Sequence, residues 1–151
     1  MTYAQALPTS LRDILDLFDS LPPCTQIPQA GRFLGQSIGP AWLIAMGLPL
    51  LKFGSLAGWK GKQFYENGKV LNIVERKKQE LEIVPIDASI ARYSKGAGDA
   101  LLLRYPDNAP FPWNRVMDEL RQLPDGRYLG ITSIRLPLFS TLPYPFILTL
   151  D

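Results

Sequence analysis

The sequence contains no histidine and only one cysteine among its 151 residues. Without histidine there is no histidine-liganded metal site, no catalytic triad with a histidine base and no histidine pH switch. Because Cys24 has no second cysteine to pair with, an internal disulfide is excluded, and a reducing, cytoplasmic location is the simpler interpretation. No histidine base is present to activate the thiol, so we expect Cys24 to be inert.

Net charge and long apolar runs are also scarce. Sixteen Lys and Arg against fourteen Asp and Glu leave +2, which is too little to indicate a nucleic-acid-binding protein. The first eight residues have neither a basic start nor an apolar run, so we expect no secretory signal. Residues 38–51 are uncharged over 14 positions, but a membrane-spanning helix needs about 20. We therefore interpret residues 38–52 as either a short buried helix or a mobile apolar lid over a pocket or against a lipid surface.

Residues 10–21 have the pattern of an amphipathic helix. Ser10 followed three positions later by Asp13 fits an N-terminal cap, and Pro22 and Pro23 end the segment because proline cannot continue the hydrogen-bond ladder. The apolar residues at helical spacing are Leu11, Ile14, Leu15 and Phe18. This helix is predicted to pack its apolar face on the rest of the protein.

Most of the remaining sequence alternates with the period of a β-strand. Asn67-Gly68 is a two-residue hairpin signal because both residues tolerate positive φ. Candidate strands lie at residues 31–37, 62–66, 69–76, 79–84, 87–95, 99–105, 127–135 and 145–150. Residues 114–123 carry apolar positions at helical spacing and are predicted to form a short helix. About eight short antiparallel strands in a single domain spanning residues 1–151 favour closure into a barrel, and the alternative with nearly the same pattern is an open, strongly curved sheet wrapped on the first helix.

Three segments in order resemble a known family. Phe-Asp-Ser-Leu-Pro-Pro at residues 18–23 leads into Gly-Arg-Phe-Leu-Gly at 31–35, and Gly-Trp-Lys-Gly-Lys-Gln-Phe follows at 58–64. This order resembles the GXWXG-type proteins, small bacterial and plant domains of largely unassigned function, over residues 10–66 and more weakly over 115–130. Phe33 stands where the family motif has tryptophan. The pattern is also similar to the Gly-x-Trp opening of lipocalin-type barrels, which implies a mostly β, lipocalin-like antiparallel barrel that binds an apolar small molecule.

Aromatic and arginine side chains supply the candidate binding site. Trp59 lies between glycines and is either a core plug or a ring against which a ligand stacks. Arg92 and Arg104 lie within strand patterns, where an inward-facing arginine could bind a carboxylate or phosphate and an outward-facing one would be solvated. Tyr93 and Tyr105 lie on the faces of these strands opposite to the arginines, so either the tyrosines or the arginines should line the interior if the barrel closes. The predicted ligand-binding residues are Trp42, Trp59, Arg92, Tyr93, Arg104 and Tyr105.

The remaining motifs give little chemistry. Asp118 and Glu119 are adjacent and would diverge on a helix, so they are interpreted as a solvated face rather than a catalytic pair. No cofactor or metal is implied. The predicted function is binding of a fatty acid, isoprenoid or phospholipid, or another apolar or amphipathic small molecule, in the barrel. The alternatives are a membrane- or protein-docking module that uses residues 38–52, and a hydrolase or isomerase acting on a hydrophobic substrate.

Overall fold

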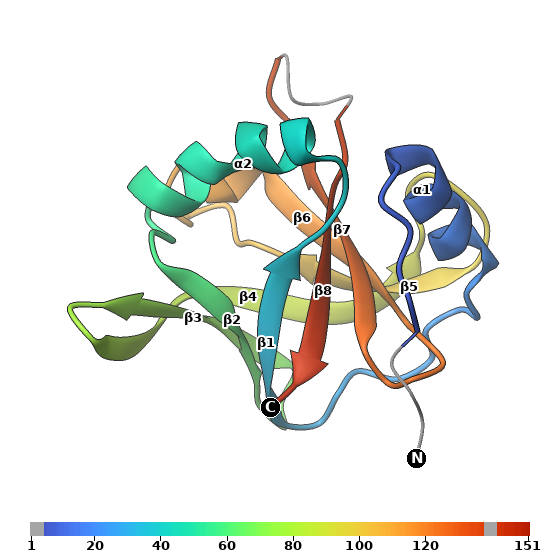
Figure 1. The fold of residues 1–151 in the computed structure, drawn as a ribbon. Coiled ribbons are helices and arrows are strands. Elements are labelled where there is room, and N and C mark those ends of the chain that lie inside the picture. Colours follow the sequence, from blue (N-terminus) through green and yellow to red (C-terminus); the bar gives the residue numbers. More distant parts are fainter. Residues whose placement is uncertain (1–4, 138–141) are drawn as a thin grey trace.

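The computed structural model describes residues 5–137 and 142–151, and within them the chain forms a closed barrel with two α-helices (Figure 1). The helices are α1 (Leu11–Ser20) and α2 (Ala41–Phe53), and η1 (Trp113–Arg115) is a single 3-10 turn. The strands are β1 (Gly31–Ser37), β2 (Trp59–Phe64), β3 (Lys69–Arg76), β4 (Gln79–Arg92), β5 (Asp99–Arg104), β6 (Val116–Gln122), β7 (Tyr128–Ile134) and β8 (Tyr144–Leu150).

The barrel closes through antiparallel pairing of every strand with its neighbour in sequence. β8 returns to pair with β1, for example Gly35 with Leu148, so each strand has a neighbour on either side, although residues 79–86 of β4 pair with β3 alone. The predicted fold class, a mostly β antiparallel barrel with an N-terminal helix and a later one, is confirmed. The β2–β3 hairpin turns through Asn67-Gly68, and the Lys69 amide donates to Asn67 Oδ1. Of the two residues Gly68 alone has a positive φ, 78°, and the Tyr65 amide donates to the Lys69 carbonyl, so the loop covers residues 66–68 instead of the predicted two.

The β4 strand corrects one prediction. The sequence indicates separate strands at 79–84 and 87–95, but β4 is a single strand of 14 residues. Pro85 and a bulge at Val84, whose φ is 54°, interrupt the alternation in the middle of the strand. Pairing with β3 continues on both sides of the bulge, so the interruption bends one strand instead of ending it.

The helix predicted at residues 114–123 is wrong. This segment is the η1 turn followed by β6. Val116, Asp118 and Leu120 are buried and alternate with outward-facing residues along β6. The four-residue spacing of Val116 and Leu120 fits one face of a helix and also one face of a strand, so it does not distinguish the two. The later helix lies instead in the apolar segment, as α2.

The α1 helix packs on the outside of the barrel. Its N-cap is Ser10, whose Oγ accepts a hydrogen bond from the Asp13 amide at 3.1 Å, as predicted. Ile14 and Phe18 are fully buried. They join an outer apolar cluster with Leu21, Tyr93, Ala100, Leu123, Leu129, Ile131 and Ile147. The helix is thus held by the outward-facing apolar residues of the sheet.

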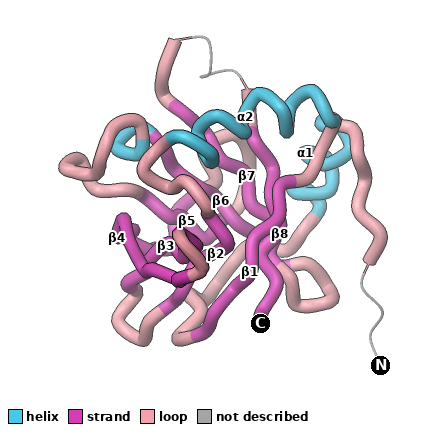
Figure 2. The backbone as a smooth tube through the Cα atoms, turned by 60° about the vertical axis from the view of Figure 1, so that its left-hand side comes forward, coloured by secondary structure: helices cyan, strands magenta, loops and turns pink. Residues whose placement is uncertain are grey.

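The α2 helix lies across one end of the barrel, in both views of the molecule (Figures 1 and 2). Within this helix the Leu43 side chain is buried, whereas Trp42 and Met46 are 54% and 43% exposed. The opposite end of the barrel is filled by contacts among the rings of Phe33, Phe64 and Tyr128. The apolar segment is therefore a helix that covers the barrel with one face and exposes the other.

Candidate functional site

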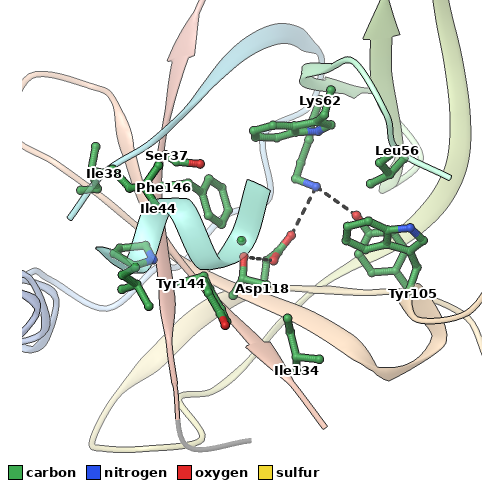
Figure 3. Close-up of a pocket in the computed structure, with 16 residues that line it drawn as sticks. Ser37, Ile38, Ile44, Leu56, Lys62, Tyr105, Asp118, Ile134, Tyr144 and Phe146 are labelled. Atoms are coloured by element: carbon green, nitrogen blue, oxygen red, sulfur yellow. Dashed lines mark hydrogen bonds and ion pairs between the residues drawn. The ribbon is translucent and has the colours of Figure 1, made fainter. Parts of the chain in front are cut away.

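A cavity of about 100 Å³ lies inside the barrel beneath α2 (Figure 3). Leu43, Ile44 and Gly47 of α2 form its cover, and the aromatic rings of Trp59 and Phe146 form part of its wall. A buried apolar cavity of about 150 Å³ admits one benzene molecule. The cavity therefore has room for about one small ring or a few water molecules.

Two opposite charges face each other at the cavity wall. Lys62 Nζ of β2 lies 3.2 Å from Asp118 Oδ2 of β6, and both side chains are about 95% buried. Figure 3 shows the Lys62 ammonium between Asp118 and Tyr105. Lys62 points inward because it lies two positions from the inward-facing Phe64, on the same face of β2. A register shift between Trp59 and Gly61 turns Trp59 to this inner face as well. Both charges are thus held by the main sheet of the protein.

The ion pair is part of a hydrogen-bonded network. Lys62 Nζ donates to Asn72 Oδ1 at 3.0 Å and to the Tyr105 hydroxyl at 3.4 Å. The Asn72 amide nitrogen donates to the Tyr105 hydroxyl at 3.1 Å and to a backbone carbonyl of β4 at 3.0 Å. The Thr132 hydroxyl donates to Asp118 Oδ1 at 2.7 Å. Side chains from β2, β3, β6 and β7, together with Tyr105 directly after β5, therefore satisfy one another in the interior.

The network keeps Lys62 and Tyr105 protonated near neutral pH. Burial by itself lowers the pKa of Lys62, but the Asp118 carboxylate and the hydrogen bonds to Asp118 and Tyr105 oppose this effect, and the pKa is raised. Burial raises the pKa of Tyr105, which the positive charge of Lys62 only partly offsets. The site therefore presents an ammonium ion and a neutral phenol at physiological pH.

The Trp59 indole is the part of the network that packs against β1. Its Nε1 donates to Asn72 Oδ1 at 3.1 Å, and Lys62 Nζ lies 5.6 Å from its ring centroid. Gly35 of β1 allows the ring to pack on the backbone, since a Cβ there would lie 2.1 Å from the indole. The Gly-x-aromatic-x-Gly segment thus makes room for Trp59 through its second glycine.

Two polar groups at the cavity have no hydrogen-bond partner among the residues that the structure describes. They are the Nε1 of Trp113, a residue only 6% exposed, and the hydroxyl of Tyr144. Both residues line the cavity. Burial raises the pKa of Tyr144, so its hydroxyl is protonated. A buried donor without an acceptor is costly, which makes these two groups candidates for contact with a bound molecule.

The structure brings two of the six predicted site residues to the cavity and leaves four outside it. Trp59 and Tyr105 line the cavity. Tyr93 lies on the outer face, where its ring packs 4.8 Å from that of Phe18 in α1. Trp42 is on the exposed face of α2, away from the lining.

The two arginines are exposed and do not reach the cavity. Arg104 faces outward on β5, because its neighbours Leu103 and Tyr105 face inward, and Arg92 lies at the exposed end of β4. The interior cation is Lys62, which the sequence reasoning missed. One signal could have found it: Lys62 is two positions from Phe64 in a strand, on the same face.

The prediction for the adjacent carboxylates Asp118 and Glu119 must also be corrected. Both are buried, at 3% and 2% exposure, instead of lying on a solvated helix face. Asp118 points into the barrel, whereas Glu119 points out of it and accepts hydrogen bonds from the Ser94 amide and hydroxyl at 2.7 and 2.6 Å. They do not form a catalytic pair, because successive residues of a strand face opposite ways.

The remaining sequence features show no reactive centre in the described parts of the chain. Cys24 is buried, its Sγ donates to the Gln26 carbonyl at 3.4 Å, and burial raises the pKa of its thiol. Over residues 5–137 and 142–151, no three His, Cys, Asp or Glu side chains gather as metal ligands. No helix among these residues is long and apolar enough to cross a membrane.

The fold and site together define a closed eight-stranded antiparallel barrel with a covered cavity at one end. No protein-family model matches the chain, so its resemblance to the GXWXG-type proteins stays a prediction. The curated proteins also give no match. A solved structure described as a crystal structure of a protein from Thermomonospora curvata is similar, with a TM-score of 0.64 over 94% of this chain and 88% of that chain. At 17% identity this similarity shows the fold alone.

Proposed function

We propose that this protein binds a small apolar or amphipathic molecule inside the barrel, in the cavity beneath α2. The observation that carries the proposal is the ion pair of Lys62 and Asp118, buried at the wall of a mostly apolar cavity. Replacing a buried ion pair by apolar side chains is often neutral or stabilising, so such a pair is weak evidence for a purely structural role. A pocket with mostly apolar walls and few polar groups is the general form of a small-molecule site.

The protonation of the site favours binding over covalent chemistry. A lysine acts as a nucleophile only when its amine is neutral, which requires a lowered pKa. The pKa of Lys62 is raised instead. Tyr105, whose pKa is also raised, holds its proton near neutral pH. The arrangement supports the hydrolase or isomerase alternative less well than the binding function.

The size of the cavity limits the ligand. Drug-sized ligands occupy pockets of about 300–1,000 Å³, whereas this cavity measures about 100 Å³. A fatty acid, isoprenoid or phospholipid chain fits only if α2 moves away from the barrel end. A ligand of about one ring fits without such a movement.

Native mass spectrometry combined with a blocked cavity tests the proposal. Gly47→Leu places an apolar side chain toward Tyr144, because a Cβ at Gly47 already lies 3.5 Å from that ring. Ala45→Leu adds the same side chain on the exposed face of α2 and is the matched control. We expect a small molecule to co-purify with the wild-type protein and with Ala45→Leu, and to be lost from Gly47→Leu. Equal occupancy of the two variants, or an empty wild-type protein that takes up no added apolar compound, would contradict the proposal.

A second candidate function is contact of α2 with a lipid surface. Trp42 and Met46 are exposed on this helix, and its sequence contains no acidic residue. Tryptophan suits the boundary between lipid and water because its ring is apolar and its N–H is polar. Sedimentation with anionic vesicles tests this function. We expect the wild-type protein to sediment and a Trp42→Ser, Met46→Ser variant to stay in the supernatant, and equal sedimentation of the two would refute it.

A further inference from the structure

The charges at the cavity are already balanced. The three N–H groups of Lys62 face Asp118, Asn72 and Tyr105, and both carboxylate oxygens of Asp118 have a partner, Lys62 for one and Thr132 for the other. A carboxylate ligand would therefore bring an unpaired negative charge into a buried site, which is strongly unfavourable. The inner charges favour a ligand without net charge.

The two unpartnered groups at the cavity wall can both donate a hydrogen bond. The Trp113 indole N–H can only donate, and it has no acceptor among the described residues. The Tyr144 hydroxyl, buried and without a partner in the same part of the chain, can also donate. The ring of Trp113 packs against Tyr105, with centroids 5.6 Å apart, so the indole is held in place at the cavity wall. The Trp113 N–H, which cannot accept, thus lacks an acceptor at the cavity, and the Tyr144 hydroxyl can donate to the same acceptor.

Resting on the proposed binding function, we propose that the ligand is an uncharged, ring-sized molecule with a carbonyl or similar acceptor oxygen, which receives a hydrogen bond from Trp113 or Tyr144. The apolar walls bury the ring, and the cavity of about 100 Å³ limits its size. This class differs from the fatty acids and phospholipids indicated by the sequence, because it carries neither a long chain nor a charge.

Three matched probes test the proposal. Cyclohexanone has the required carbonyl, methylenecyclohexane has nearly the same shape with no acceptor oxygen, and cyclohexanecarboxylate carries a negative charge at neutral pH. The protein has three tryptophans, so ¹H–¹⁵N spectra contain three indole N–H signals, which Trp→Phe variants assign. The exposed Trp42 serves as an internal control.

We expect cyclohexanone to move the Trp113 signal downfield, to leave the Trp42 signal in place, and to bind more tightly than the other two probes. A neutral hydrogen bond contributes about three- to tenfold in affinity. Trp113→Phe and Tyr144→Phe keep the rings and each remove one donor. At least one of them should lower the affinity for cyclohexanone by about that factor and leave the affinity for methylenecyclohexane unchanged.

The outcomes separate this inference from the function on which it rests. If methylenecyclohexane binds as tightly as cyclohexanone, or if cyclohexanecarboxylate binds best, the cavity binds ligands but the inferred class is wrong. If no probe perturbs the Trp59 or Trp113 signals, both the binding function and the ligand class are refuted. If neither Phe variant lowers the affinity for cyclohexanone, the two donors do not hold the carbonyl and the inference fails.

Discussion

The burial of Lys62 makes a sharp prediction about stability. Lys62→Met keeps an apolar side chain of similar length and removes the ammonium, which leaves the Asp118 carboxylate inside the barrel with only the Thr132 hydroxyl as partner. At 3.2 Å the attraction between the two charges is about 5 kcal/mol for an effective dielectric constant of about 20. Breaking a buried pair on one side costs about 3–5 kcal/mol, so we expect the free energy of unfolding to fall by about that amount.

Urea unfolding followed by circular dichroism measures this loss, and two further variants serve as controls. Lys60→Met changes an exposed lysine of the same strand, which pairs with Glu75 and Glu80 at the surface, and should have little effect. Lys62→Met combined with Asp118→Asn removes both charges and should recover about 1–3 kcal/mol relative to the sum of the single changes. If Lys62→Met unfolds at the wild-type urea concentration, or if the double variant shows no recovery, the two charges are not coupled and the site is open to water.

Three other predictions concern the scaffold around the site. Arg121→Met should lower the stability by about 3 kcal/mol and increase hydrogen exchange in α1, because this buried guanidinium donates to three backbone carbonyls; Arg92→Met, at an exposed position, should change neither. Gly35→Ala should lower the thermal midpoint because the new Cβ overlaps an indole ring, whereas a Cβ at Gly47 of α2 makes only ordinary contacts with the Tyr144 ring, so Gly47→Ala should not. Cys24 should react with iodoacetamide at pH 8 far more slowly in the folded than in the urea-unfolded protein, since burial raises the pKa of its thiol; equal rates by mass spectrometry would show that it is accessible.

The parts of the fold that depend on local signals were predictable from the sequence. The Ser10 cap, the Asn67-Gly68 turn and the alternation in most strands each act within a few residues, and all appear in the structure. The number of short antiparallel strands favoured closure over an open curved sheet, because closure removes exposed strand edges, and the barrel is closed. The continuity of β4 was not predictable in the same way, because Pro85 beside a bulge has the local pattern of a strand end.

The β6 strand was mistaken for a helix because the partners that make it a strand are far away in sequence. Asp118 is neutralised by Lys62, and Arg121 is bonded to the carbonyls of Phe18, Ala97 and Asp99. A charged residue within a strand pattern normally indicates the solvent side. Long-range partners reverse that rule here, and no local pattern contains them.

The two buried cations show why the interior anchor is a lysine while the arginines of the strands stay outside. A guanidinium carries five N–H donors in a rigid plane and an ammonium only three that rotate freely. Arg121 lies against the Phe18 and Tyr93 rings, outside the barrel, where α1 and the β4–β5 turn offer backbone carbonyls for its donors. Lys62 has three acceptors within 3.4 Å, one for each N–H, and an arginine there would leave donors unpaired beside an apolar cavity. The size and donor number of the side chain, together with the strand face, therefore decide which charge can sit at the cavity.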